Sequence, residues 1–279
     1  MINITAYLTH SLIADELTLK GKNVIVIDAL RATSTIATAL VNGAKEVIPT
    51  ENAATAVRVA KGSGNSMLCG ERGGKIIEGF NLGNSPLEYT AEAIKDKSLV
   101  FSTTNGTVSL SKAKYAKNCL LASFLNIQAV VDFVKELNED IVIICSGKLN
   151  NFCIEDAVCA GVIINKLIDK NEENYSFTDS ENACIKLAKA YAYEKSKISP
   201  NKILDMMKIS EHGKYLVEIG FQNDLEFCSA VDSVHSIPML KSGIIKLKEK
   251  FEGESMQKMQ MKKLSLTTDK EEVSAKDVA

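Results

Sequence analysis

Four carboxylates follow hydrophobic segments of the sequence, and they are the residues best suited to chemistry. Asp28, for example, comes directly after the β-branched run VIVI at residues 24–27. Carboxylates in this number are hard oxygen ligands that suit Mg²⁺, which commonly links carboxylates to a phosphate group. The sequence therefore predicts a metal site that would also hold phosphate. The expected metal ligands are Asp28, Glu71, Glu155 and Asp156.

Cationic, amide and hydroxyl groups stand close to these carboxylates in the sequence. Arginine, lysine and the N–H groups at helix N-termini are common partners of phosphate oxygens. Lys148 and Arg31 would offset the charge on the phosphoryl group. The residues expected to bind the phosphate are Arg31, Ser34, Arg72, Thr104, Asn105, Gly106 and Thr107.

Each of these groups also has a structural explanation that needs no ligand. Asp28 could cap the turn that follows it, and Arg31 could pair with a surface carboxylate. Residues 105–107 could form only a turn and a helix cap. Glu155 and Asp156 suit the first turn of any helix. The complete set is harder to explain by structure alone than any single member.

The elements that must position these residues follow a repeated order of buried strand, polar turn and helix rich in small residues. This alternation predicts an α/β fold, a three-layer α/β/α sandwich around a mostly parallel or mixed sheet. In such sheets ligands bind beyond the carboxyl ends of the strands, where the polar residues stand. Strands are expected at 1–9, 24–27, 46–49, 67–69, 98–102, 118–122 and 140–145, and helices at 36–40, 52–61, 89–94, 108–115, 127–137, 157–167, 183–195 and 202–207.

Other segments have weaker patterns. Residues 70–86 are rich in Gly, Asn and Ser and are expected to form a long loop of the kind that often carries function. Residues 225–230 and 234–239 are expected to return to the fold as apolar segments, the second broken by Pro238. Residues 244–251 are expected to form a helix or a strand.

One α/β domain is expected over residues 1–251, with a subdivision near 168–182 as the alternative. Residues 252–279 are polar and carry charges of both signs, which predicts a disordered tail.

The composition of the 279 residues excludes several functional classes. The formal net charge is −2 and no basic stripe is interleaved with aromatic residues, so no nucleic-acid partner is expected. No apolar run is long enough to span a membrane, and the first residues do not resemble a secretory signal. We expect a cytoplasmic protein with no membrane partner, and a homo-oligomer is compatible with the sequence.

Seven cysteines lie mostly in apolar segments and are expected to be free, buried thiols. A zinc site is not expected, because no histidine lies near Cys153 or Cys159 in the sequence. His10, His212 and His235 are expected to be non-catalytic, because none lies in a polar cluster at a predicted strand end.

Several familiar motifs are absent from the sequence. It contains no GxxxxGK[ST] and no GxGxxG, which argues against the use of nucleoside triphosphates and dinucleotides. It contains neither GxSxG, the serine-hydrolase elbow, nor DxDx[TV], the motif of the common aspartyl-phosphate phosphatases.

The order and spacing of several blocks are more specific, and with them the chain resembles the 2-phosphosulfolactate phosphatases over roughly residues 1–240. A weaker block, residues 220–238 with DLEFCSAVD inside it, resembles the carboxyl end of that family. The stronger blocks are IDALRATST (27–35), GERGGKIIEGFNLGNSPLE (70–88), STTNGT (102–107), ASFLN (122–126) and CSGKLNNFCIEDAVCAG (145–161).

The resemblance implies a Mg²⁺-dependent phosphatase that hydrolyses 2-phospho-3-sulfolactate to 3-sulfolactate, a step of coenzyme M biosynthesis in methanogens. It also implies a three-layer α/β/α fold and the four metal ligands named above, with Arg31, Thr104, Asn105 and Thr107 near the phosphate. One departure is Val108, since a basic residue often follows NGT in the family pattern.

The catalytic residues expected from the motifs and the chemistry together are Asp28, Arg31 and Lys148. Asp28 would hold the metal or attack the phosphorus itself, and a water nucleophile is the alternative. The expected partner is a small phosphorylated, sulfonated acid. Two other functions stay open, a phosphatase for another small phosphorylated hydroxy acid and a non-catalytic binder of small anionic metabolites.

Overall fold

The structure is a computed structural model that describes residues 1–62, 64–169, 171–250 and 252. Its centre is an eleven-stranded mixed sheet in the order β5-β4-β6-β3-β13-β12-β7-β2-β8-β1-β9, and β10 and β11 form a separate two-stranded sheet. The strands are β1 (Ile2–Tyr7), β2 (Asn23–Ile27), β3 (Glu46–Pro49), β4 (Ser66–Arg72), β5 (Lys75–Ile76), β6 (Ser98–Ser102), β7 (Asn118–Ala122), β8 (Ile141–Cys145), β9 (Tyr175–Ser176), β10 (Tyr193–Glu194), β11 (Lys197–Ile198), β12 (Pro238–Lys241) and β13 (Ile244–Leu247).

Five parallel strands, β7, β2, β8, β1 and β9, form one part of the large sheet. All five residues of β2 are buried, because both faces of the sheet are covered there. Val24 and Val26 belong to one hydrophobic core, and Ile25 and Ile27 belong to the other. This division follows from the alternation of side chains along a strand.

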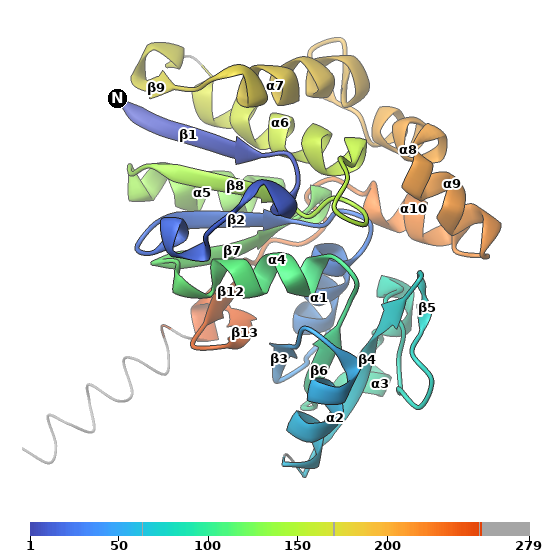
Figure 1. Cartoon of the computed structure of the whole chain (residues 1–279). Coiled ribbons are helices and arrows are strands. Elements are labelled where there is room, and N and C mark those ends of the chain that lie inside the picture. Colours follow the sequence, from blue (N-terminus) through green and yellow to red (C-terminus); the bar gives the residue numbers. More distant parts are fainter. Residues whose placement is uncertain (63, 170, 251, 253–279) are drawn as a thin grey trace, which may run out of the picture.

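Three more parallel strands, β4, β6 and β3, form the other part, and the antiparallel pair β12–β13 joins the two parts. In Figure 1, β1, β8, β2 and β7 run across the view, whereas β3, β6 and β4 run steeply below them. The carboxyl ends of β2, β4 and β6 meet where the two parts adjoin. There Thr104 contacts Glu71, and Gly106 packs against Asp28.

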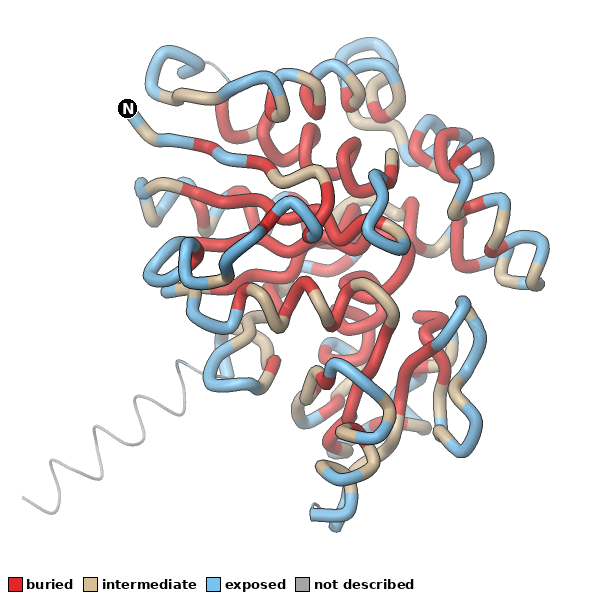
Figure 2. Tube along the Cα trace, in the orientation of Figure 1, coloured by how far each residue is buried: buried red, intermediate tan, exposed pale blue. Residues whose placement is uncertain are grey.

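Helices cover both faces of the sheet (Figure 1). Figure 2 shows that burial is concentrated along the strands and the inner sides of these helices. The core with Ile25 and Ile27 includes residues of α5, α6 and α7, and the core with Val24 and Val26 includes residues of α1 and α4. The α-helices are α1 (Ala32–Val41), α2 (Ala53–Lys61), α3 (Ala91–Ile94), α4 (Gly106–Lys112), α5 (Ile127–Leu137), α6 (Ile154–Ile168), α7 (Asp179–Tyr191), α8 (Pro200–Ile209), α9 (Glu211–Glu218) and α10 (Gln222–Cys228). Short 3₁₀ helices lie at His10–Leu12, Glu16–Leu19, Pro86–Glu88, Ala113–Tyr115, Phe124–Asn126 and Glu172–Asn174.

The predicted α/β fold with a mostly parallel, mixed sheet between helices is confirmed, and the differences concern the weaker segments. Most of 225–230 lies in helix α10, whose buried side chains include Leu225 and Cys228, three residues apart on one helix face. The segment 234–239 is divided at Pro238, as expected: residues 234–237 lie outside any strand, and Pro238 opens β12, because the first residue of a strand tolerates a missing N–H. The expected loop at 70–86 begins as the antiparallel pair of β4 and β5.

Two expectations concern the ends of the chain and the membrane. The tail predicted over 252–279 lies, apart from Glu252, outside the described residues. Within the part of the chain that the structure describes, no helix is both long enough and apolar enough to cross a membrane.

Candidate active site at the carboxyl ends of the strands

Asp28 lies just beyond the end of β2 and is only 7% exposed. Its Oδ1 accepts a hydrogen bond of 3.1 Å from the N–H of Ala32 in the first turn of α1. Burial raises the pKa of Asp28 from its ordinary 3.8 to about 6, and the charges of Glu71 and Glu155 add to the rise. The Ala32 hydrogen bond and His212 act in the opposite direction. Asp28 therefore forms a group of buried carboxylates with Glu71 and Glu155, which we call the acidic cluster.

Glu71 ties the end of β4 to the turn after β6. Its Oε1 accepts a hydrogen bond of 2.7 Å from the N–H of Thr104, and its Oε2 accepts one of 2.8 Å from the N–H of Gly74. A glycine makes this approach possible, because a Cβ on Gly70 would lie 1.9 Å from the carbonyl oxygen of Ser102. Glu71 is itself buried. The long loop of the sequence prediction thus brings a second carboxylate to the strand ends.

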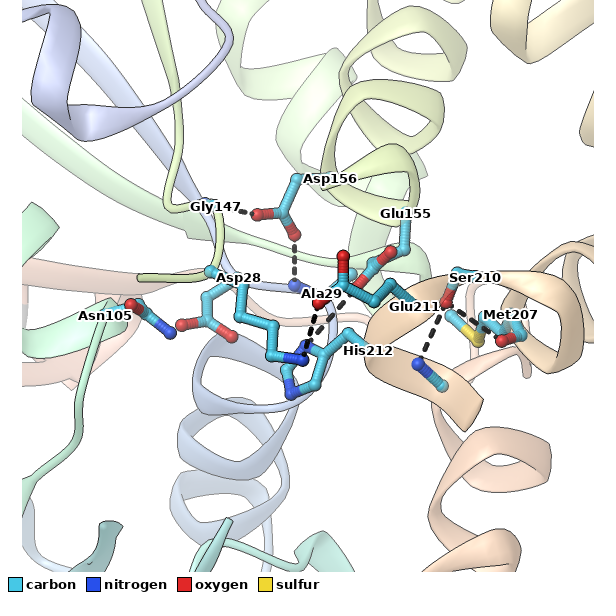
Figure 3. Close-up of polar contacts among 12 residues, drawn as sticks. Asp28, Ala29, Asn105, Gly147, Glu155, Asp156, Met207, Ser210, Glu211 and His212 are labelled. Carbon is cyan, nitrogen blue, oxygen red and sulfur yellow. Dashed lines mark hydrogen bonds and ion pairs between the residues drawn. The ribbon is translucent and has the colours of Figure 1, made fainter. Parts of the chain in front are cut away.

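Glu155 lies in the first turn of α6 and is 2% exposed. Its Oε1 is 3.2 Å from Nδ1 of His212, yet this oxygen forms no hydrogen bond of acceptable geometry. His212 stands at the start of α9, where the Oγ of Ser210 caps the helix by accepting a 2.9 Å hydrogen bond from the N–H of Gly213. Figure 3 shows the Glu155 carboxylate pointing toward His212.

The contact between His212 and Glu155 places a histidine in a polar cluster, whereas the sequence analysis expected no histidine in one. The expectation failed because His212 is distant from the strand ends in the sequence and reaches them only through the position of α9. The available signal was local, since Ser210 directly before Glu211 and His212 is a helix-cap pattern that presents these side chains at a helix start.

Asp156, the neighbour of Glu155, holds two loops together. Its Oδ1 accepts a 2.9 Å hydrogen bond from the N–H of Ala29, and its Oδ2 accepts a 2.9 Å hydrogen bond from the N–H of Gly147 (Figure 3). Burial, with the charges of Asp28 and Glu155, raises the pKa of Asp156 well above its ordinary value. Both oxygens are thus used to position the segments that follow β2 and β8.

Arg31 is paired inside the protein. Its Nη1 lies 2.6 Å from Oδ2 of Asp224, its Nη2 donates a 2.7 Å hydrogen bond to the carbonyl of Gly74, and its guanidinium lies 4.3 Å from the ring centre of Phe221. Asp224 also accepts a 2.6 Å hydrogen bond from Ser85. The surface ion pair weighed as an alternative for Arg31 is instead a buried one. Sequence reasoning did not single out Asp224, although it opens the block DLEFCSAVD.

Two predicted phosphate-binding hydroxyls are buried and bonded to their own surroundings. The Oγ of Ser34 donates a 2.9 Å hydrogen bond to the carbonyl of Ala29. The Oγ1 of Thr107 accepts from the N–H of Thr103 at 3.1 Å and donates to its carbonyl at 2.9 Å. In this structure both hydroxyls stabilise the turns that carry the site.

The turn after β6 brings the remaining predicted groups beside Asp28. The Oγ1 of Thr104 is buried and has no hydrogen-bond partner. The Oδ1 of Asn105 accepts a 3.0 Å hydrogen bond from the N–H of Leu149, which joins this turn to the loop after β8. Gly106 leaves room for Asp28, because a Cβ there would lie 2.7 Å from Asp28 Oδ2.

Arg72 and Lys148 are the predicted cations with partial access to solvent. Arg72 is exposed and donates to the carbonyl of Glu71 at 2.6 Å and to the Oγ of Ser102 at 2.9 Å. The Nζ of Lys148 lies 3.2 Å from Oε1 of Glu211. Lys148 lines a cleft of about 290 Å³ that also reaches Glu155 and His212.

Comparison with known proteins adds a second line of evidence to this geometry. The family model described as 2-phosphosulpholactate phosphatase matches residues 7–243 of the chain. The chain belongs to this family. It is accordingly an enzyme, a phosphatase.

Relatives with the same family name are similar over most of their length. A protein of Caldanaerobacter subterraneus subsp. tengcongensis named "probable 2-phosphosulfolactate phosphatase" is 41% identical over 250 residues, which cover 89% of this chain and 99% of the relative. A protein of the same name from Thermotoga maritima is 39% identical, over 82% of this chain and 93% of its own. One from Clostridium acetobutylicum is 38% identical, over 81% and 92%.

The acidic cluster of this phosphatase fits a divalent cation. Asp28, Glu71 and Glu155 are buried carboxylates from three separate segments, and Glu155 keeps an oxygen without a hydrogen bond. Buried charges are ordinarily paired or coordinate a metal, because an isolated charge is costly to remove from water. Oxygen donors of this type suit Mg²⁺. Both oxygens of Asp156 and both oxygens of Glu71 accept hydrogen bonds from main-chain N–H groups, so a cation bound there would share these oxygens with the backbone.

Proposed function

We propose that this phosphatase hydrolyses 2-phosphosulfolactate to 3-sulfolactate and inorganic phosphate, with Mg²⁺ held by Asp28, Glu71 and Glu155. The observation that supports the cation is that these three carboxylates are buried and that the charges of Glu71 and Glu155 raise the pKa of Asp28. The observation that supports the substrate is the family match over residues 7–243. A non-catalytic anion binder is disfavoured, because buried carboxylates alone would repel an anion.

When bound, Mg²⁺ would polarise the phosphoryl oxygens and offset their negative charge. The chain's own residues place the reacting groups. The pKa of about 6 leaves Asp28 ionised at neutral pH, so its carboxylate can accept a hydrogen bond from the attacking water and orient it. Asp156 holds the turns after β2 and β8 at a fixed separation through Ala29 and Gly147.

The substrate carries a phosphate, a carboxylate and a sulfonate, so it needs cationic partners besides the metal. Arg72 at the end of β4 and Lys148 at the cleft are the basic side chains that supply this charge in our proposal. Arg31 contributes indirectly, because its contacts with Asp224 and Gly74 hold the β4–β5 turn, and with it Glu71, near α1. It is a positioning residue.

The test is phosphate release from 2-phosphosulfolactate, compared with 2-phospholactate, which lacks the sulfonate. We expect kcat/KM to be at least about tenfold higher for the sulfonated substrate, because a site built for a charged group rejects an analogue without it. Chelation should abolish the activity, and added Mg²⁺ should restore it. Equal rates for the two compounds would support the other candidate function, a phosphatase for hydroxy acids without sulfonate. Activity that survives chelation would contradict the metal assignment.

We also infer that the enzyme works in the reducing cytoplasm. The support comes from the seven cysteines, all of which are free and buried.

A further inference from the structure

Three side chains, one of them Glu155 of the acidic cluster, form a group with a different chemistry. Cys153 directly precedes α6, Glu155 lies in the first turn of that helix, and His212 stands at the start of α9. One ligand atom from each residue, a thiol sulfur, a carboxylate oxygen and an imidazole nitrogen, lies within 4.8 Å of the other two. Figure 3 shows two members of the group, with Glu155 above the ring of His212.

Glu155 supplies an independent sign that a ligand is expected at this point. The Glu155 side chain is only 2% exposed, and its buried Oε1 forms no hydrogen bond. Nδ1 of His212 lies 3.2 Å from this oxygen, but no hydrogen bond joins the two atoms. A buried carboxylate oxygen with no donor is costly, so each case calls for an explanation such as an ion.

We infer that Cys153, Glu155 and His212 bind a borderline divalent cation of the Zn²⁺ type. Thiolate, imidazole and carboxylate are the ligands that Zn²⁺ uses in proteins, whereas Mg²⁺ is bound through oxygen. Three protein ligands leave a fourth position open, as in catalytic zinc sites. His212 lies beside Cys153 in the fold, although no histidine is near Cys153 in the sequence. Glu155 is shared with the proposed Mg²⁺ ligands, so the two cations would be neighbours.

The geometry requires a small movement. A tetrahedral ion with bonds of about 2.0–2.3 Å holds its ligands about 3.3–3.8 Å apart, so the group must contract by at most about 1.5 Å. His212 can supply this movement, because it is partly exposed at a helix start. On binding, the Cys153 thiol releases its proton to solvent and the thiolate forms the bond to the metal.

Ions can reach the group from solvent. Cys153, Glu155 and His212 all line the cleft of about 290 Å³, together with Lys148 and Glu211. All seven cysteines are buried, but among the described residues Cys153 is the one that belongs to a cluster of metal-binding side chains. A thiolate–metal signal can therefore be assigned to one residue.

The test is a titration of the chelator-treated full chain with Co²⁺, a spectroscopic substitute for Zn²⁺. We expect a thiolate-to-cobalt charge-transfer band that saturates at one equivalent and disappears when Zn²⁺ is added. Cys153→Ser should abolish the band, and Cys184→Ser serves as the matched control that keeps it. His212→Asn should weaken the affinity for Co²⁺ by about tenfold or more, as is usual for loss of a contact that fixes a metal site. His235→Asn, at an exposed histidine, should leave it unchanged.

Absence of the band from the unmodified chain would overturn the inference, and so would its persistence in Cys153→Ser. If Cys153→Ser fails to fold, the pair His212→Asn and His235→Asn decides, because equal Co²⁺ affinities would remove His212 from the site. The readout is the absorption of substrate-free protein, so a negative result leaves the proposed phosphatase reaction untouched. Conversely, a chain without phosphatase activity could still show the band.

Discussion

Asp28 and Asp205 carry the same carboxyl group in opposite surroundings, which makes them a matched pair for mutation. Asp28 is buried in the acidic cluster, and Asp205 is exposed on α8. We predict that Asp28→Asn lowers kcat for phosphate release at least about a hundredfold, the usual scale for loss of a group that assists proton transfer or holds the reaction's electrostatics. Asp205→Asn should leave kcat unchanged. The proposal fails if the two variants release phosphate equally well.

Arg31 and Asp224 form a buried ion pair of 2.6 Å, whose two side chains are each 2% exposed. Removing Asp224 leaves the Arg31 charge buried without an opposite charge to pair with. We predict that Asp224→Ala lowers the free energy of unfolding by about 3–5 kcal/mol, as measured by urea denaturation.

The exposed pair of Lys117 and Glu139, 2.7 Å apart, is the control for that experiment. Lys117→Ala should change the free energy of unfolding by less than about 1 kcal/mol, because solvent screens an exposed pair. Similar losses for the two variants would mean that the Arg31 pair is not important for stability.

At the scale of elements, the start of α4 sets the position of Asp28. A Cβ on Gly106 would lie 2.6 Å from Cβ of Ala32 and 2.7 Å from Oδ2 of Asp28, so α4 must withdraw or the carboxylate must turn. We predict that Gly106→Ala lowers kcat/KM at least about tenfold and the free energy of unfolding by about 1–3 kcal/mol, the usual cost of overpacking.

Gly64 provides the comparison, since a Cβ there would meet nothing within 4 Å. Gly64→Ala should keep the activity of the unmodified enzyme. Full activity in Gly106→Ala would show that α4 does not control the geometry of Asp28.

The strands could be predicted from the sequence, because runs such as 24–27 and 141–145 are apolar on both faces and have no other stable location than a covered sheet. The structure of residues 225–230 could not be predicted, since a short apolar segment fits helix and strand equally well until its neighbours are known. Packing of α10 against the rest of the chain decides the outcome there.

At the scale of the whole molecule, the carboxylates of the site were predictable because each stands at or after the apolar run of a strand in the sequence. The residues that contact the site from distant parts of the sequence were not predictable. Asp224 reaches Arg31, and His212 reaches Glu155, only after α9 and α10 have packed beside the strand ends. Such contacts depend on tertiary arrangement and leave no periodic pattern in a single sequence.

The acidic cluster also links the stability of the whole fold to pH and metal. Asp28 has a pKa of about 6 in the folded protein, against an ordinary 3.8, so between these values the folded chain binds more protons than the unfolded chain. The contribution of Asp28 to the free energy of unfolding of the metal-free protein therefore falls as pH rises from about 4 to about 6, and the raised pKa of Asp156 acts in the same direction. Mg²⁺ should reverse this loss, because it binds the ionised carboxylates of the folded state.

We therefore predict that Mg²⁺ raises the melting temperature more at pH 7 than at pH 5, since at the lower pH Asp28 is protonated in most molecules and protons compete with the metal. Thermal melts with chelator and with Mg²⁺ at both values of pH measure the effect. In Asp28→Asn without metal, the free energy of unfolding should fall less as pH rises, because the variant side chain carries no charge to bury. A stabilisation by Mg²⁺ that is equal at both pH values, and equal in the variant, would show that the cation binds elsewhere.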